Sequence, residues 1–309
     1  MFFRILTLLM ACVSMAVAQP PSWQAHTAPV HSLTFSPDGK TLASAGFDGA
    51  IKLWAWPDAK ETKSLPAHPS PAYSVAYSPD GLQLATCSVE PVIKIWTTAD
   101  GKMAKEIKGH TGIVDCVAFS PDGKVLASAS SDKSVRLWNT ADGKEIKKLG
   151  DHTANAYTVA FSKDGKMLLS TGADNLVKLW DVNEKKALRD LKGHTAPVTG
   201  AVFLPDGKTV ASISHDRTVK LWNVADGKEA GSMGPTPDDL YGIALSPDGK
   251  KLATSGYGGN LTVWDLAAKK QVFQKKLPQF GAYCVIWSPD GKKILTGHDR
   301  QEIHVTAAP

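Results

Sequence analysis

Histidine, serine and aspartate side chains recur along the sequence at constant spacing. Two of these sets are His110, Ser128, Asp132 and His194, Ser212, Asp216. The same three residue types form a hydrolase triad, in which histidine activates serine and aspartate orients the histidine. Comparable sets stand in five consecutive stretches at identical register, however, and five active sites in one chain are not expected. A buried hydrogen-bonded network explains the repetition better, because each polar atom would satisfy another. The sequence therefore predicts structural sets and no catalytic residue.

Metal and phosphate chemistry have less support. The sequence has no Cys-x-x-Cys, His-Glu-x-x-His or calcium-loop pattern. His31, His215 and His298 would form a metal site only if the fold gathered them at one mouth of a channel, which stays open as a minor alternative. The glycines around Gly258 lie in a turn and not at the strand-to-helix junction that would hold a phosphate. We expect no metal and no cofactor.

A repeat of 42 residues positions these sets. The turn Ser36-Pro37-Asp38-Gly39 returns six more times with small changes, at steps of 42. A tryptophan follows each of the first six turns at the same step, and the seventh step falls on Thr306. The tryptophans are Trp54, Trp96, Trp138, Trp180, Trp222 and Trp264. Self-similarity at this period is typical of propeller and solenoid folds.

Each repeat has the pattern of four short strands. Residues 30–35 are rich in apolar side chains and end at the Pro-Asp-Gly turn, and residues 41–44 alternate between apolar and polar. A second turn precedes residues 51–54, and a weaker fourth run, such as 145–149, closes each repeat. Four antiparallel strands every ~40–45 residues form a propeller blade. The sequence thus predicts an all-β, seven-bladed propeller.

The ends of the chain are predicted to close the ring. The register places Ser22-Trp23-Gln24 at an outer-strand position with no blade of its own, and the chain stops after the third strand of repeat seven. We expect the N-terminal strand to complete the last blade and to cover an edge that would otherwise favour aggregation. Residues 19–309 would then form a single domain.

The chain resembles the WD-repeat family over the whole length that follows its first eighteen residues. Blades of that family carry a histidine before the first strand, a hydroxyl in the second, an acid in the next turn and a tryptophan in the third. The sets in repeats three and five continue to Trp138 and Trp222 in this way. The resemblance implies a buried chain that joins histidine, hydroxyl, acid and tryptophan. It also implies a scaffold for protein interactions without enzymatic activity.

Repeats six and seven depart from that pattern. Thr236 and Gly258 stand where repeat six should have histidine and aspartate. Pro278 and Thr306 stand where repeat seven should have histidine and tryptophan, and Asp299 is one place out of register. We expect these two blades to be the most mobile part of the ring.

Tyrosines gather at one register of the repeats. Four of them, Tyr73, Tyr157, Tyr241 and Tyr283, begin the innermost strand of their repeat, and a fifth precedes an acidic turn position. Both registers surround one mouth of the central channel in a propeller of the resembled family. Tyrosine offers a large contact area at low entropic cost and is enriched in binding hot spots. The predicted partner-binding residues are Tyr73, Tyr157, Tyr241, Tyr257, Tyr283, His31, Phe47, Asp115 and His215.

Two kinds of ligand fit such a surface. We expect a peptide or protein segment, and carbohydrate or another small ligand is the alternative, because tyrosines also stack on sugars. The rings would otherwise pack against neighbouring blades and only plug the channel. The formal net charge of +5 is mild and dispersed, which argues against nucleic acid. We expect a monomer that does not span a membrane.

The first eighteen residues differ from the rest. Arg4 precedes an apolar run that ends in Ala16-Val17-Ala18, the pattern of a cleavable signal peptide. We therefore expect residues 1–18 to be removed from an exported protein, periplasmic or extracellular, similar to an exported bacterial member of the family. Leu9-Met10-Ala11-Cys12 resembles a lipobox, so lipid attachment at Cys12 is a minority alternative. The other cysteines are expected to be buried and unpaired: Cys87, Cys116 and Cys284.

Overall fold

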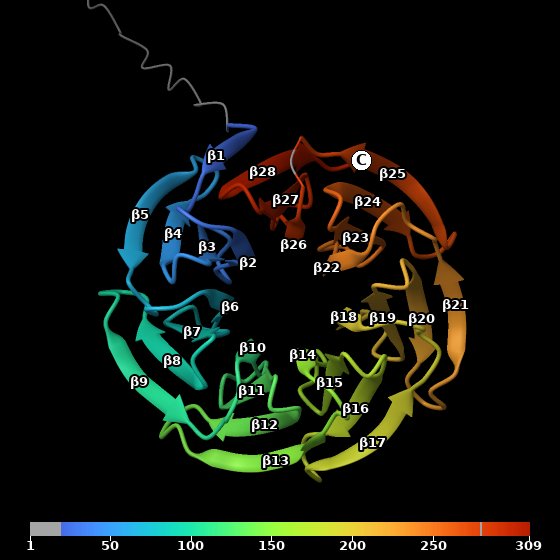
Figure 1. Cartoon of the computed structure of the whole chain (residues 1–309), viewed down its shortest axis with the longest axis horizontal. Helices are drawn as coiled ribbons and strands as arrows, with labels where there is room; N and C mark the ends of the chain where they lie inside the picture. Colours follow the sequence, from blue (N-terminus) through green and yellow to red (C-terminus); the bar gives the residue numbers. More distant parts are fainter. Residues whose placement is uncertain (1–19, 279) are drawn as a thin grey trace, which may run out of the picture.

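Seven four-stranded sheets follow one another around a ring (Figure 1). The computed structural model describes residues 20–278 and 280–309. In these residues every helix or strand assigned is a β-strand, and neighbouring strands of each blade are antiparallel. The prediction of an all-β, seven-bladed propeller is confirmed. The predicted leader, residues 1–18, lies outside the described residues.

In blades one to six, the four strands follow one another in chain order from the innermost to the outermost. Blade one has β2 (Val30–Phe35), β3 (Thr41–Gly46), β4 (Ile51–Ala55) and β5 (Lys60–Leu65). Blade two has β6 (Ala72–Tyr77), β7 (Gln83–Ser88), β8 (Val92–Thr97) and β9 (Met103–Lys108). Blade three has β10 (Val114–Phe119), β11 (Val125–Ser130), β12 (Ser134–Asn139) and β13 (Glu145–Asp151). Blade four has β14 (Ala156–Phe161), β15 (Met167–Gly172), β16 (Val177–Asp181) and β17 (Lys186–Leu191).

The last blade takes one of its strands from the start of the chain. Blade five has β18 (Val198–Phe203), β19 (Thr209–Ser214), β20 (Val219–Asn223) and β21 (Glu229–Met233). Blade six has β22 (Leu240–Leu245), β23 (Lys251–Gly256), β24 (Asn260–Asp265) and β25 (Lys270–Lys276). Blade seven has β26 (Ala282–Trp287), β27 (Lys293–His298), β28 (Glu302–Ala307) and, from the other end of the chain, β1 (Ser22–Gln24).

The N-terminal strand closes the ring as predicted. β1 pairs antiparallel with β28, with Ser22 opposite His304 and Gln24 opposite Glu302. Backbone bonds from Ala25 and His26 to the carbonyl of Gln301 continue this junction past the end of the strand. The two ends of the chain therefore hold one sheet together and cover its outer edge.

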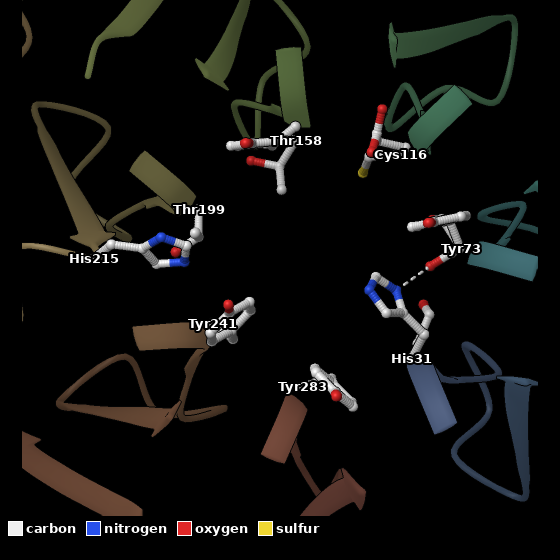
Figure 2. A pocket seen from close by; sticks show the side chains of 12 residues that line it. His31, Tyr73, Cys116, Thr158, Thr199, His215, Tyr241 and Tyr283 are labelled. Carbon is white, nitrogen blue, oxygen red and sulfur yellow. Dashed lines mark hydrogen bonds between the residues drawn. The ribbon is translucent and has the colours of Figure 1, made fainter. Parts of the chain in front are cut away.

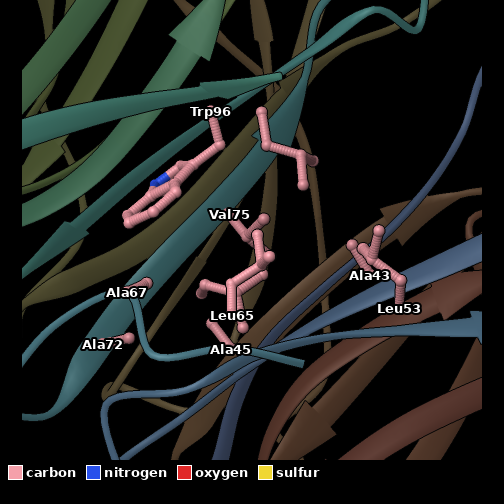
Figure 3. Packing of buried hydrophobic residues seen from close by; sticks show 10 residues of the cluster. Ala43, Ala45, Leu53, Leu65, Ala67, Ala72, Val75 and Trp96 are labelled. Carbon is pink, nitrogen blue, oxygen red and sulfur yellow. The ribbon is translucent and has the colours of Figure 1, made fainter. Parts of the chain in front are cut away.

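Packing between blades fixes the position of the innermost strands. The second strand of every blade is buried over its last five residues, as in β3 and β11, because a blade lies against each of its faces. Figure 3 shows one such core, where Leu53 and Leu65 of blade one meet Val75 and Trp96 of blade two. Each large apolar side chain that is fully buried contributes about 1.5–3 kcal/mol. The cores thus hold the innermost strands rigidly around the axis.

The set in blade three forms one buried hydrogen-bonded chain. Trp138 Nε1 donates to Ser128 Oγ at 2.8 Å, and the same oxygen lies 2.7 Å from His110 Nε2. His110 Nδ1 lies 2.8 Å from Asp132 Oδ2. Burial tends to raise the pKa of Asp132, but hydrogen bonds from Ser134 and His110 hold this pKa well below its usual value. Every member has a partner, so the chain satisfies polar atoms within the fold.

Three other blades repeat this geometry, and blade two departs from it. The equivalent sets are His26 with Ser44, Asp48 and Trp54, His152 with Ser170, Asp174 and Trp180, and His194 with Ser212, Asp216 and Trp222. In blade two, His68 Nε2 lies 2.9 Å from Thr86 Oγ1, but Glu90 Oε2 lies 3.5 Å from His68 Nδ1. The longer glutamate therefore replaces aspartate only loosely.

Blade seven fills the space of its missing histidine from another strand. In blade one the imidazole of His26 covers Gly46 so closely that a Cβ there would lie 2.3 Å from the ring Nδ1. In blade seven the residue corresponding to Gly46 is His298, which is fully buried with its Nε2 2.8 Å from Thr296 Oγ1. Blade seven therefore contains the imidazole–hydroxyl pair although Pro278 occupies the usual histidine position.

Blade six fills the same space with a carboxylate. A Cβ on Gly256 would lie 2.7 Å from Asp238 Oδ2, and Asn260 Nδ2 donates to Asp238 Oδ1 at 3.0 Å. Trp264 Nε1 still donates to Thr254 Oγ1 at 3.0 Å. Both departing blades thus have alternative polar contacts. Their higher mobility stays a prediction.

Candidate functional site

A β-bulge aims one side chain of each innermost strand at the axis. In β2, Val30 pairs with Gly46 and Ser32 with Ala45, so His31 is an extra residue without a partner across the ladder. The same irregularity recurs in all seven innermost strands. The extra residues, called the rim from this point on, are His31, Tyr73, Asp115, Tyr157, Thr199, Tyr241 and Tyr283. Bulges are a common means of re-aiming side chains at functional sites.

The rim surrounds a cavity of about 370 Å³ at the mouth of the channel. Figure 2 shows labelled rim residues from several blades pointing toward a common space. Ser32, Ser74, Cys116 and Thr158, which follow rim residues in the chain, also line the cavity. This volume lies near the lower end of the range for ligand pockets, ~300–1,000 Å³. The cavity therefore has room for one side chain or a small ligand.

Aromatic rings form an unbroken series along one arc of the rim. His31 stacks on Phe47 with ring centroids 5.0 Å apart and contacts Tyr73 edge-on at 4.9 Å. Tyr283 lies 5.9 Å from both His31 and Tyr241. These residues are half-buried, so they present ring faces and edges to the cavity. Such surfaces suit stacking and apolar contact.

The series extends outward on the side of blade five. Tyr241 lies 4.8 Å from His215 and 6.1 Å from Tyr257. Tyr257 is 58 % exposed and stands outside the cavity lining, at its outer margin. A ligand larger than the cavity would therefore find aromatic surface beyond the rim.

Both histidines of this region are kept neutral. His31 donates from Nδ1 to the carbonyl oxygen of Tyr73 at 2.8 Å. Burial lowers the pKa of His31, and the bond to Tyr73 opposes this only in part. Burial also lowers the pKa of His215, whose buried Nε2 has no hydrogen-bond partner among the described residues. Neither imidazole therefore supplies a positive charge to the cavity near neutral pH.

Asp115 lies on the other arc of the rim. It belongs to blade three and stands between Tyr73 of blade two and Tyr157 of blade four. Burial raises its pKa to about 7, and the backbone amide of Ser131 opposes this only in part. Burial also raises the pKa of the Tyr73 and Tyr157 phenols, and the charge of Asp115 raises them further. Asp115 Oδ2 is buried without a hydrogen-bond partner in the described part of the chain. Asp115 and His215 thus each have one buried polar atom at the site that the described residues leave unpaired.

The structure brings all nine predicted partner-binding residues to this one face. Seven of the nine line the cavity, while Phe47 and Tyr257 pack beside it. The sequence pattern does not predict the second layer of lining residues, such as Cys116 and Thr158. Regular alternation would turn a residue next to a rim residue away from the axis, and only the bulge brings both to the cavity.

The minor alternative of a histidine cluster is contradicted, and the expected burial of Cys116 and Cys284 was wrong. His298 does not join His31 and His215, because it is buried in blade seven with its ring 4.7 Å from that of His304. Within residues 20–278 and 280–309, no group of three His, Cys, Asp or Glu side chains could hold a metal ion. Cys116, expected to be buried, is half-buried and lines the cavity.

The three cysteines differ in how deeply they are buried. Cys87, Cys116 and Cys284 are all unpaired, as predicted, and Cys87 is buried, but Cys284 is only half-buried. Burial raises the pKa of the Cys116 thiol, so this cavity-lining thiol stays protonated near neutral pH and is a poor nucleophile.

Comparison with known proteins agrees with the repeat pattern. The chain matches the family described as "WD domain, G-beta repeat" over residues 19–55, 59–97, 101–139, 143–181, 185–223 and 230–265. Blade seven, with its changed histidine and tryptophan positions, lies largely beyond these ranges. No curated protein matches the chain. None of the described residues belongs to a helix long and apolar enough to cross a membrane. Since the matched ranges cover most of a ring of seven blades, the chain belongs to the WD-repeat family.

Proposed function

We propose that the protein is a non-enzymatic scaffold that binds a peptide, or an extended segment of a protein, across the rim. The observation that carries this proposal is the unbroken series of half-buried rings from Phe47 through His31 and Tyr283 to Tyr241. Pre-positioned aromatic side chains lose little conformational freedom on binding and are frequent hot spots. The family to which the chain belongs serves generally as an interaction scaffold.

Three features support binding over catalysis. The serine of each His–Ser–Asp set is fully buried, as Ser128 is, and accepts a tryptophan N–H. No activated nucleophile lines the cavity, because the Cys116 thiol is protonated near neutral pH. His31 uses Nδ1 on a backbone carbonyl, which leaves one ring nitrogen for a ligand.

We propose further that the scaffold works outside the cytoplasm. The support is the leader pattern of residues 1–18. Mass spectrometry of the protein secreted by an expression host would give the mature N-terminus. A mature chain that starts at Gln19 supports export by simple cleavage. A lipid-modified N-terminus at Cys12 supports the anchored alternative, and an uncleaved cytoplasmic chain contradicts both.

Selection from a library of random peptides tests the binding proposal. Peptides are selected on the immobilised protein and their affinities are compared for three proteins: the unchanged chain, the double variant Tyr241→Ala/Tyr283→Ala, and the control Leu82→Ala. Leu82 is 64 % exposed in a turn of the opposite face, so its loss removes apolar surface outside the rim. We expect the double variant to lose at least about tenfold in affinity, since hot-spot residues contribute ~2 kcal/mol each.

Folding of the variants is checked by thermal melting. Because both tyrosines are only half-buried, we expect the double variant to melt within a few degrees of the unchanged protein. Peptides that bind the double variant and the unchanged protein equally would contradict the proposal. Wholesale unfolding would show that the rings are core. A glycan array run in parallel separates the carbohydrate alternative, which would give sugar binding and no selected peptides.

A further inference from the structure

The lining of the cavity contains one carboxyl group, that of Asp115, and no lysine or arginine. The two lining histidines, His31 and His215, have lowered pKa values because of burial. A ligand that enters the cavity therefore meets one acid without a counter-charge.

Asp115 differs from the acids of the structural sets in its hydrogen bonding. Asp132, on the same blade, accepts bonds from His110, Thr111 and Ser134. Asp115 Oδ2 has no partner in residues 20–278 and 280–309. A buried carboxylate oxygen without a partner costs free energy, and a cationic donor reduces that cost. The fold thus maintains an unfavourable group at the place where a ligand enters.

The surroundings of Asp115 also favour a cation. Tyr73 and Tyr157 stand on the two neighbouring blades, close enough for the acid to affect the pKa of both phenols. Tyrosine ring faces attract ammonium and guanidinium groups, most strongly when these groups are desolvated. Hydroxyl groups of Ser74 and Thr158 also line this arc and can accept the remaining N–H bonds.

We propose that the bound peptide inserts one basic side chain, arginine or lysine, into the cavity, where its cationic group pairs with the carboxylate of Asp115. This inference rests on the proposed peptide binding and names the side chain that anchors it. The cavity of about 370 Å³ holds one such side chain, and the backbone of the peptide would cross the aromatic surface above it. Arginine fits well, because its planar group both stacks on rings and pairs with carboxylates.

The first experiment uses three small probes and needs no variant. The protein is labelled with ¹³C in its tyrosine rings and titrated with the N-acetyl amides of arginine, lysine and citrulline. Citrulline has the shape of arginine without its charge. We expect arginine or lysine amide to shift the ring signals of Tyr73 and Tyr157 at concentrations where citrulline amide leaves them unchanged. Equal shifts from citrulline and arginine would overturn the inference.

The second experiment removes the charge of the acid. Asp115→Asn keeps the shape of the side chain, and the matched control Asp239→Asn removes an exposed charge beside Tyr241 and His215, outside the cavity lining. We expect Asp115→Asn to weaken binding of the basic probe at least about tenfold, the scale of a hydrogen bond to a charged group. Asp239→Asn should change it less than about twofold, since exposed charges contribute little. Equal losses of affinity in the two variants would mean that only the summed negative charge of this face attracts the probe, which would contradict the specific pairing with Asp115.

Selected peptides separate this inference from the proposed function. If peptides bind through Tyr241 and Tyr283 but tolerate replacement of every arginine and lysine by glutamine, the basic anchor is wrong and the scaffold proposal stands. If the small cations bind through Asp115 but no peptide does, peptide binding itself is contradicted, and with it the anchor that depends on it.

Discussion

Blade three holds two carboxylates in opposite situations. Asp132 closes a buried chain with His110 and Ser128, and hydrogen bonds keep its pKa well below the usual value. Asp115, at the rim of the same blade, has a buried oxygen without a partner, and burial raises its pKa to about 7. The first acid contributes to stability because the fold satisfies it. The second reduces stability in the free protein, which is typical of groups reserved for a ligand.

The largest expected effect comes from breaking the buried hydrogen-bonded chain that contains Asp132. Ser128→Ala removes the oxygen shared by Trp138 Nε1 and His110 Nε2, which leaves two buried polar atoms unpaired. We expect a loss of about 2–4 kcal/mol in the free energy of unfolding, seen as a fall of ~3–8 °C in melting temperature for a domain of this size. Ser64→Ala, on the exposed face of β5, is the control. A Ser128→Ala protein that melts with the control would show that the chain contributes nothing to stability.

A smaller loss is expected from blade seven. His298→Ala leaves a cavity and removes the partner of Thr296 Oγ1, so we expect a cost of about 1–3 kcal/mol. Because β27 pairs with β28 and β28 with β1, amide hydrogen exchange should speed up in these strands before it does in blade three. Uniform exchange around the ring would contradict both this effect and the expected mobility of blades six and seven.

Replacement of Asp115 is expected to raise the stability of the fold, in contrast to the two substitutions above. Between its ordinary pKa of 3.8 and its folded pKa of about 7, the folded chain holds a proton on Asp115 that the unfolded chain has released. The contribution of this group to stability therefore falls as pH rises through that window. Asp115→Asn removes the dependence, so it should melt a few degrees above the unchanged protein at pH ~8 and level with it at pH ~4. Destabilisation by this variant at pH ~8 would show that the carboxylate is satisfied after all.

Much of the ring follows from the sequence, because its causes are local. The 42-residue period, the Pro-Asp-Gly turns and the alternation of apolar residues define the blades, and a simple shift of register predicts the pairing of β1 with β28. The position of Tyr73 and its equivalents at one mouth follows from their place at the start of the innermost strand. The strands and turns need only the neighbours of each residue along the chain, and the pairing of β1 with β28 follows from counting the repeats.

Other features depend on contacts that the sequence pattern does not contain. The bulges at Asp115 and Tyr157 each add a residue to one strand only, which brings Cys116 and Thr158 into the lining against the expected alternation. His298 and Asp238 fill spaces that a histidine at Pro278 and at Thr236 would have filled. Such replacements put a polar side chain into the same space from a different position of the repeat, so a comparison with the motif finds only a missing residue.

The most direct test of the cation site is the titration of Asp115 itself. Carboxyl ¹³C NMR of the protein, with Asp115→Asn to assign the signal, gives the pKa of this group in the free protein and in the presence of arginine amide. We predict a value of about 7 in the free protein and a clear fall when the cation is added, because pairing favours the ionised carboxylate. An ordinary aspartate pKa in the free protein, or a raised one that the cation does not change, would contradict the assignment of this acid as the ligand's anchor.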